Sequence, residues 1–135
     1  RTLGKEEIIK LANSLKKYTL IILSLPSRQN EINDFILKEN LSNCTLSYTT
    51  ETIFDATELM RCCDILISPD TSFIHIASAI DLPTIGLYYK DNFTYWGPKS
   101  SINYVVRTNN YDLVFDKVAE HVKEIYVKLE KKVAI

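Results

Sequence analysis

The sequence predicts an α/β fold, a three-layer αβα sandwich of the Rossmann-like kind built around a mostly parallel sheet of about five strands. The first observation is that short apolar runs alternate along the chain with longer segments whose apolar residues recur at helical spacing. The second is that residues 63–88 read as strand, helix and strand, with both strands apolar enough to be buried in a parallel sheet. The 135 residues, 46% of them apolar, suffice for one core, so we expect residues 1–135 to form a single domain.

Five elements are expected before the central stretch: helices over residues 5–17, 31–41 and 54–62, and strands over residues 18–25 and 45–48. The first helix is amphipathic, because its apolar residues recur at helical spacing between lysines and glutamates. The first strand is an apolar run rich in β-branched residues that ends at Pro26. In the third helix we expect Ile53, Ala56 and Leu59 to face inward, and Phe54 and Met60 to belong to the core.

The central stretch and the remainder supply the other elements: strands over residues 64–68, 84–88 and 102–106, a helix from about residue 70 to residue 80, and a long helix from residue 111 or 112. A loop rich in aromatic residues, 89–101, follows the second of these strands. Trp96 in this loop either stacks on a base or sugar or packs under the loop, and the sequence leaves both open. The last helix either covers the sheet or crosses to another domain.

The polar residues of the central stretch fall where open α/β sheets bind ligands. Asp70, Thr71 and Ser72 follow a buried strand and begin a helix, so free backbone N–H groups and the positive end of the helix dipole lie beside them. Hydroxyl donors from Thr71 and Ser72 add to this environment, which suits a phosphate. His75 follows one turn later and projects on roughly the same face. The alternative is that these residues only cap the helix and that His75 is an ordinary surface residue.

These residues also carry a family resemblance. The sequence DTSFIHIA at 70–77, with Ala79, Pro83 and the Trp-Gly-Pro of 96–98, resembles glycosyltransferase family 9, the ADP-heptose:lipopolysaccharide heptosyltransferases. The resemblance implies the C-terminal half of a GT-B type glycosyltransferase. Two departures stand out: Ser72 replaces the usual Gly, and Tyr88-Tyr89-Lys90 replaces a Phe-Gly-Pro type turn.

The resemblance assigns roles to particular residues. It implies that Asp70, Thr71, Ser72 and His75 bind the nucleotide sugar donor, with Asp70 either capping the helix or binding the sugar. It implies that Glu31 contacts the ribose of the donor, against the alternative that Glu31 is a solvated acid in a first helical turn. Arg1 lies near the spacing of a family lysine that reaches the diphosphate.

The resemblance further implies an inverting transfer of a heptose or related sugar from a nucleotide diphosphate sugar, with ADP-heptose the expected donor, to a lipopolysaccharide core acceptor. It implies no metal and no cofactor. The catalytic base belongs to an amino-terminal domain in the family, and this chain opens at Arg1 without Met, so we expect a fragment that binds the donor and does not catalyse transfer alone. We expect a cytoplasmic protein, with the full-length enzyme peripheral at the inner face of the bacterial inner membrane.

Composition excludes several other classes. A formal charge of −1 without a basic run argues against a nucleic-acid surface, and no apolar run reaches the roughly 18 residues that span a bilayer. Three glycines cannot form a P-loop or a G-x-G-x-x-G motif. The two histidines and three cysteines, two of them adjacent, give no metal-ligand spacing. Two alternatives remain: a non-catalytic nucleotide or sugar-phosphate binding module, and a flavodoxin-like or receiver-type signalling domain. A receiver domain needs an acidic cluster after its first strand and a lysine after its last strand, and neither is evident in this sequence.

Overall fold

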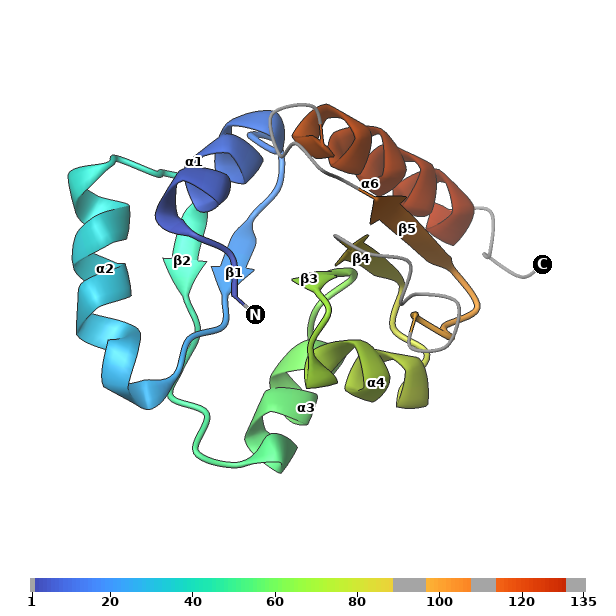
Figure 1. The fold of residues 1–135 in the computed structure, drawn as a ribbon, viewed down its shortest axis with the longest axis horizontal. Coiled ribbons are helices and arrows are strands. Elements are labelled where there is room, and N and C mark those ends of the chain that lie inside the picture. Colours follow the sequence, from blue (N-terminus) through green and yellow to red (C-terminus); the bar gives the residue numbers. More distant parts are fainter. Residues whose placement is uncertain (1, 89–96, 108–113, 131–135) are drawn as a thin grey trace. The chain divides into compact units, whose positions relative to one another are not determined.

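The computed structural model describes residues 2–88, 97–107 and 114–130, and its helices and parallel strands confirm the α/β fold class (Figure 1). The chain divides into two compact units. The N-terminal unit holds Leu3–Cys62, and the C-terminal unit holds the residues from Cys63 onward together with the start of the chain. Each unit has its own sheet, where the sequence predicted one: β1 pairs with β2, and the second sheet has the order β3-β4-β5. The apolar pattern locates strands but does not say which strands pair.

The N-terminal unit contains α1 (Lys5–Ser14), β1 (Leu20–Ile22), the 3-10 helix η1 (Pro26–Arg28), α2 (Gln29–Lys38), β2 (Cys44–Leu46) and α3 (Ile53–Arg61). β1 and β2 run parallel, with Leu20 opposite Cys44. The apolar sides of α1 and α2 pack together in a core whose buried members are Ala12, Ile32, Phe35, Ile36, Leu41 and Cys44. Both strands are shorter than their predicted ranges, 18–25 and 45–48.

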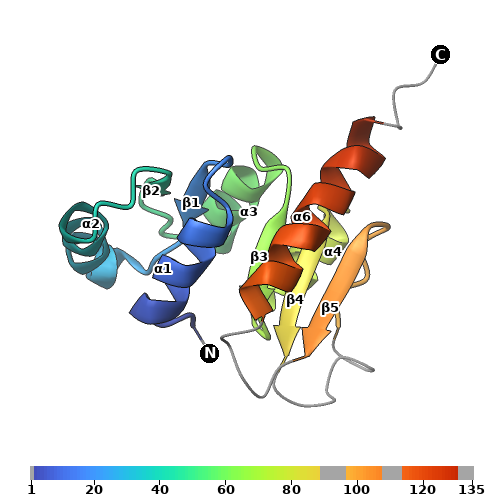
Figure 2. The ribbon, with the colours of Figure 1, turned by 90° about the horizontal axis from the view of Figure 1, so that it is seen from above.

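The C-terminal unit contains β3 (Leu66–Pro69), α4 (Ser72–Ala79), β4 (Thr84–Tyr88), β5 (Asn103–Arg107) and α6 (Val114–Glu130). All of its strands are parallel, and every residue of the central strand β4 is buried. Figures 1 and 2 show α4 and α6 on opposite faces of this sheet, which gives the unit three layers. The helices present fully buried side chains to the sheet, among them Ile74, Ala77, Val118 and Ile125.

Both units end a helix in the same way. Asn40 after α2 and Asp81 after α4 have φ angles of 52° and 55°, in the left-handed region that a short polar side chain tolerates. The next residue is in each case a buried leucine whose N–H reaches back into the helix: Leu41 to Ile36 O at 3.1 Å and Leu82 to Ala77 O at 2.9 Å. This closure satisfies helix-end carbonyls and directs the chain into the following strand.

The third helix corrects two predictions, that Ile53 faces inward and that Phe54 belongs to the core. Met60 is buried as expected, but the Phe54 and Ile53 side chains are 77% and 57% exposed. The buried stripe of α3 consists of Ala56, Leu59 and Met60 and starts one turn into the helix. Phe54 lies about 200° around the helix from Ala56, so it cannot share that stripe.

No helix among the described residues is long and apolar enough to cross a membrane. The predicted loop residue Trp96 and the predicted start of the last helix at residue 111 or 112 lie outside the described ranges, as does Arg1.

Candidate functional site

The start of α4 brings four of the predicted site residues together. β3 ends at Pro69, Asp70 is exposed, Thr71 is the N-cap with extended backbone angles, and α4 begins at Ser72. His75 is exposed and lies three residues after Ser72, hence on the neighbouring part of the helix surface. The four residues thus lie at the carboxyl end of β3, where parallel sheets commonly bind ligands.

The hydroxyl of Thr71 faces the strand end and does not cap the helix. Its Oγ1 lies 2.9 Å from Ser68 Oγ, and Ser68 Oγ donates to the carbonyl of Pro69 at 2.9 Å. Because Ser68 uses its single proton on that carbonyl, the Thr71 hydroxyl donates to Ser68. The Thr71 side chain makes no capping hydrogen bond to the first turn. The first-turn N–H groups of α4 therefore receive no hydrogen bond from that side chain. The alternative that Thr71 only caps the helix predicts such a bond, and the structure does not contain it.

Ser72 departs from the usual glycine without backbone strain. The positive-φ residues of the described chain are Asn40 and Asp81, so the backbone at position 72 does not require glycine. The Ser72 side chain is exposed at the first position of α4. Solvent can therefore reach this residue at the start of the helix.

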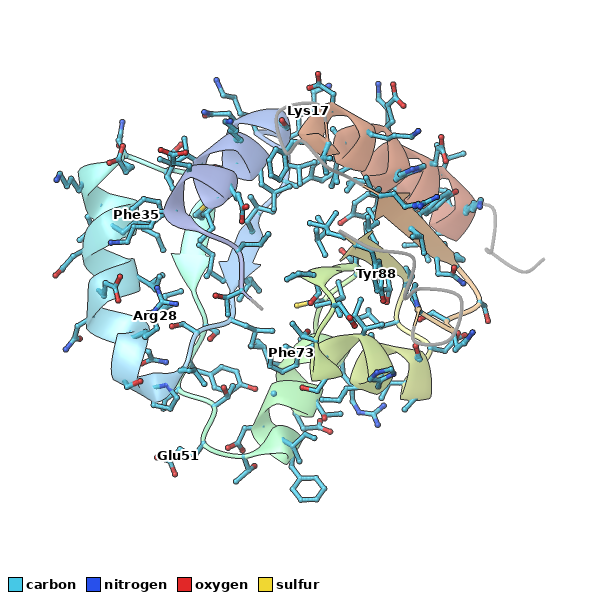
Figure 3. The ribbon with its side chains drawn as sticks, viewed as in Figure 1. Lys17, Arg28, Phe35, Glu51, Phe73 and Tyr88 are labelled. Carbon is cyan, nitrogen blue, oxygen red and sulfur yellow. The ribbon has the colours of Figure 1, made fainter. Side chains whose placement is uncertain are left out.

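Tyr88 is part of this region although the sequence pointed to it only as a departure from the family. Tyr88, labelled in Figure 3, ends β4. Because Pro69 pairs with Leu87, Tyr88 lies at the same carboxyl end of the sheet as Asp70. The side chain is only 2% exposed. Burial, with the negative charge of Asp70 in second place, raises the pKa of Tyr88 to about 12.

Gly86 makes room for the Tyr88 ring. The two residues share one side of β4, and a β-carbon at position 86 would lie 2.5 Å from Tyr88 Cε2 and 3.3 Å from Ile74 Cδ1. Ile74 belongs to α4, so the space beside Gly86 is shared by the Tyr88 ring and a side chain of the helix that carries the candidate site. A glycine two residues before a strand-ending tyrosine was the available sequence signal.

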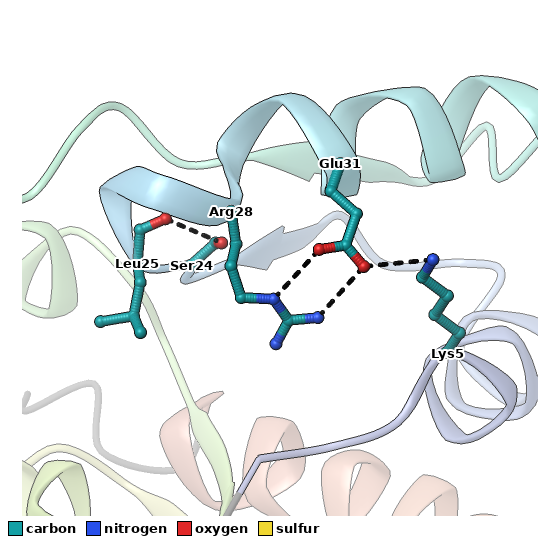
Figure 4. A network of polar contacts seen from close by, with 5 residues as sticks. All are labelled: Lys5, Ser24, Leu25, Arg28 and Glu31. Atoms are coloured by element: carbon teal, nitrogen blue, oxygen red, sulfur yellow. Dashed lines mark hydrogen bonds and ion pairs between the residues drawn. The ribbon is translucent and has the colours of Figure 1, made fainter.

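Glu31 lies in the first turn of α2, where two cations hold its carboxylate (Figure 4). Arg28 Nε lies 3.3 Å from Oε2 and Arg28 Nη2 lies 3.5 Å from Oε1. Lys5 Nζ of α1 approaches Oε1 to 3.2 Å. The hydrogen bonds from Arg28 and then Lys5, with their charges, lower the pKa of Glu31 below its usual value.

The start of α2 is tied to the carboxyl end of the β1–β2 pair. The Thr49 hydroxyl, just after β2, donates to Gln29 Oε1 in the first residue of α2 at 2.9 Å. The Glu31 side chain remains 47% exposed and borders a depression of about 520 Å³ between α1 and α2. A ligand can therefore reach this carboxylate. Glu31 and the start of α4 belong to different units.

Metal ligation has no candidate cluster in the ranges that the structure describes: no group of three or more His, Cys, Asp or Glu side chains there could hold an ion.

The sequence model of glycosyltransferase family 9 (heptosyltransferase) matches residues 6–124. The chain belongs to glycosyltransferase family 9. No curated protein sequence matches this family 9 chain. Among solved structures, E. coli ADP-heptose LPS heptosyltransferase II is similar, with a TM-score of 0.74 and 19% identity over 94% of this chain and 42% of that one. E. coli heptosyltransferase WaaC with ADP gives a TM-score of 0.67 and 17% identity over 90% of this chain and 38% of that one.

These likenesses confirm the fold class and the suspected family. The family 9 chain spans about two fifths of the length of each of those structures. The matched family is one of glycosyltransferases, the class of enzyme that the sequence predicted.

Proposed function

We propose that this chain is the donor-binding domain of a glycosyltransferase that moves a heptose or related sugar from a nucleotide diphosphate sugar to a lipopolysaccharide core acceptor. ADP-heptose is the proposed donor, as substrate, with no cofactor. The family match supports the class of reaction, and one similar structure was solved with ADP. The observation that carries the proposal is the start of α4: a helix end without a side-chain cap from its N-cap residue, at the carboxyl edge of a parallel sheet.

The donor diphosphate would lie at this helix start. Backbone N–H groups of the first turn, the Ser72 hydroxyl and the helix dipole all favour an anion there. Thr71 would contribute through its backbone and, after releasing Ser68, through its hydroxyl. Arg1 would add a positive charge. The exposed His75 would hydrogen-bond the donor, and Asp70 would accept a hydroxyl of the sugar.

In the reaction, the acceptor hydroxyl oxygen forms a bond to the anomeric carbon while the bond from that carbon to the diphosphate oxygen breaks. The electron pair of the broken bond stays on the leaving nucleotide diphosphate. Donors at the start of α4 stabilise this developing charge without reorganising during the reaction. The acceptor proton passes to a base that we assign to an amino-terminal domain, and this chain alone would bind donor without transferring sugar. The acceptor would bring the enzyme to the cytoplasmic face of a bacterial inner membrane as a peripheral protein.

Calorimetric titration with ADP, UDP, GDP and CDP tests the proposal. We expect ADP to bind, and we expect His75→Ala and Asp70→Ala each to weaken that binding by about 10- to 100-fold, the value of a hydrogen bond involving a charged group. His121→Ala is the matched control, because the other histidine lies on α6 and pairs with Glu124. Melting temperatures of all variants should stay close to that of the unmodified protein.

Two results would contradict the proposal. One is a folded protein that binds none of the four nucleotides at millimolar concentration. The other is an equal loss of affinity in the His121→Ala control. Binding of a nucleotide without sugar transfer by the longest available form of the protein would favour the alternative of a non-catalytic binding module.

A further inference from the structure

Arg28 holds the Glu31 carboxylate by both of its oxygens. The arginine occupies the N-cap of α2, three residues before Glu31, and its Nε and Nη2 atoms face Oε2 and Oε1 at 3.3 and 3.5 Å. Two parallel contacts from a planar guanidinium fix the rotation of a carboxylate, which a single contact does not do. Lys5 Nζ adds a third contact at 3.2 Å from α1.

We propose that Arg28, assisted by Lys5, is a positioning residue that orients the Glu31 carboxylate to receive a ribose hydroxyl of the donor nucleotide. The inference rests on the proposed function and on the expectation from the family resemblance that Glu31 contacts the donor ribose. It extends that expectation to a residue that the sequence analysis did not assign. A glutamate without partners samples several rotamers, and immobilising it on binding costs affinity. Ion pairs made before the nucleotide arrives remove part of that cost.

The contacts also fix how many ribose hydroxyls Glu31 can serve. A carboxylate offers about four lone-pair sites. The three cation contacts occupy two sites on Oε1 and one on Oε2. One site on Oε2 remains, so the carboxylate accepts from a single ribose hydroxyl. The 47% exposure of the Glu31 side chain leaves room for that hydroxyl to approach.

A purely structural ion pair is the competing explanation, because exposed pairs of this kind are common and contribute little to stability. The chain offers a matched pair for comparison. Arg61 Nε lies 3.2 Å from Glu58 Oε1 on α3, also at i, i+3 spacing and also exposed. Removing Arg61 tests the general effect of losing such a pair, and removing Arg28 tests its effect on Glu31.

The experiment is a calorimetric titration with ADP, 2′-deoxy-ADP and 3′-deoxy-ADP, applied to the unmodified protein and to Glu31→Gln, Arg28→Ala, Arg28→Lys and Arg61→Ala. We expect the unmodified protein to bind ADP about 10-fold more tightly than one of the two deoxy nucleotides, with the other close to ADP. Glu31→Gln should abolish the difference. Arg28→Ala should reduce it to about 3-fold or less and leave the affinity for the discriminated deoxy nucleotide unchanged.

The remaining variants complete the design. Arg28→Lys keeps the charge but makes a single-point contact, so the discrimination should fall between those of Arg28→Ala and the unmodified protein. The Arg61→Ala control should keep the full difference. Circular dichroism at the titration temperature checks that every variant is folded.

Three other outcomes would refute the positioning role of Arg28. Equal losses for ADP and both deoxy nucleotides in Arg28→Ala would mean that the guanidinium contacts the diphosphate, and unchanged discrimination would make it a surface ion pair. Both outcomes refute the positioning role while the proposed function stands. Absence of nucleotide binding by the unmodified protein refutes the proposed function and the positioning role with it.

Discussion

The first turns of α4 and α2, one in each unit, offer different groups to a ligand. They are also held in place by different interactions, which are called their supports below. The start of α4 offers hydrogen-bond donors with no acidic residue in its first turn, and it rests on buried packing around Gly86, Tyr88 and Ile74. The start of α2 offers a carboxylate acceptor, and it rests on exposed ion pairs from Arg28 and Lys5. Phosphate oxygens bind hydrogen-bond donors and ribose hydroxyls bind acceptors, so each helix start suits a different chemical group.

The supports should also differ in what they contribute to stability. Buried packing is sensitive to a single added carbon, whereas exposed ion pairs are screened by water and salt. The first two of the following predictions disturb the buried support and the third disturbs the exposed one.

Gly86→Ala should have the largest effect. Its β-carbon would lie 2.5 Å from Tyr88 Cε2 in a site with no free space, so the ring or the strand must shift. We expect the free energy of unfolding to fall by about 1–3 kcal/mol, measured by urea denaturation. Gly4→Ala is the matched control in the N-terminal unit, because its β-carbon would meet only Glu7 Oε2 at 3.7 Å. We expect a loss of at most about 1 kcal/mol there. Equal losses in both variants would refute the packing argument.

Ionisation of Tyr88 should destabilise the folded protein at alkaline pH. Its pKa of about 12 in the folded protein lies above the ordinary value of 10.0, so the fold favours the neutral phenol. This contribution is fully present below pH 10 and is lost as pH rises through 12. Urea denaturation between pH 9 and 12 should show a fall of about 2 kcal/mol that is absent in Tyr88→Phe. A Tyr88→Phe curve parallel to that of the unmodified protein would mean that other groups cause the fall.

The Glu31 ion pairs should have the smallest effect on stability, and that effect should appear at acidic pH. Its pKa lies below the ordinary value of 4.5, so its contribution to stability is present above pH 4.5 and is lost as pH falls through the lowered pKa. In an NMR titration of side-chain carboxyl carbons, we expect the Glu31 midpoint below 4.5 and expect Arg28→Ala to move it upward. Arg61→Ala should leave the midpoint in place. A midpoint unaffected by Arg28→Ala would indicate that the ion pair does not persist in solution.

The sequence by itself determined much of the local structure. The observed bounds of β4, Thr84–Tyr88, coincide with the predicted ones, and helices α1 to α4 lie within a few residues of their predicted ranges. Asp70, Thr71, Ser72 and His75 lie together because they are neighbours along one strand end and one helical turn. Apolar periodicity and capping residues act over a few positions, so they can be recognised without the rest of the chain.

Only the tertiary structure decided the supports of these residues. Tyr88 lies at the edge beside Asp70 because β3 and β4 pair in a particular register, and Lys5 reaches Glu31 across 26 positions of sequence because α1 packs beside α2. Phe54 is exposed although its apolar character predicted burial. Register, burial and ion pairing between distant residues depend on which surfaces meet when the chain packs, and no local pattern encodes that choice.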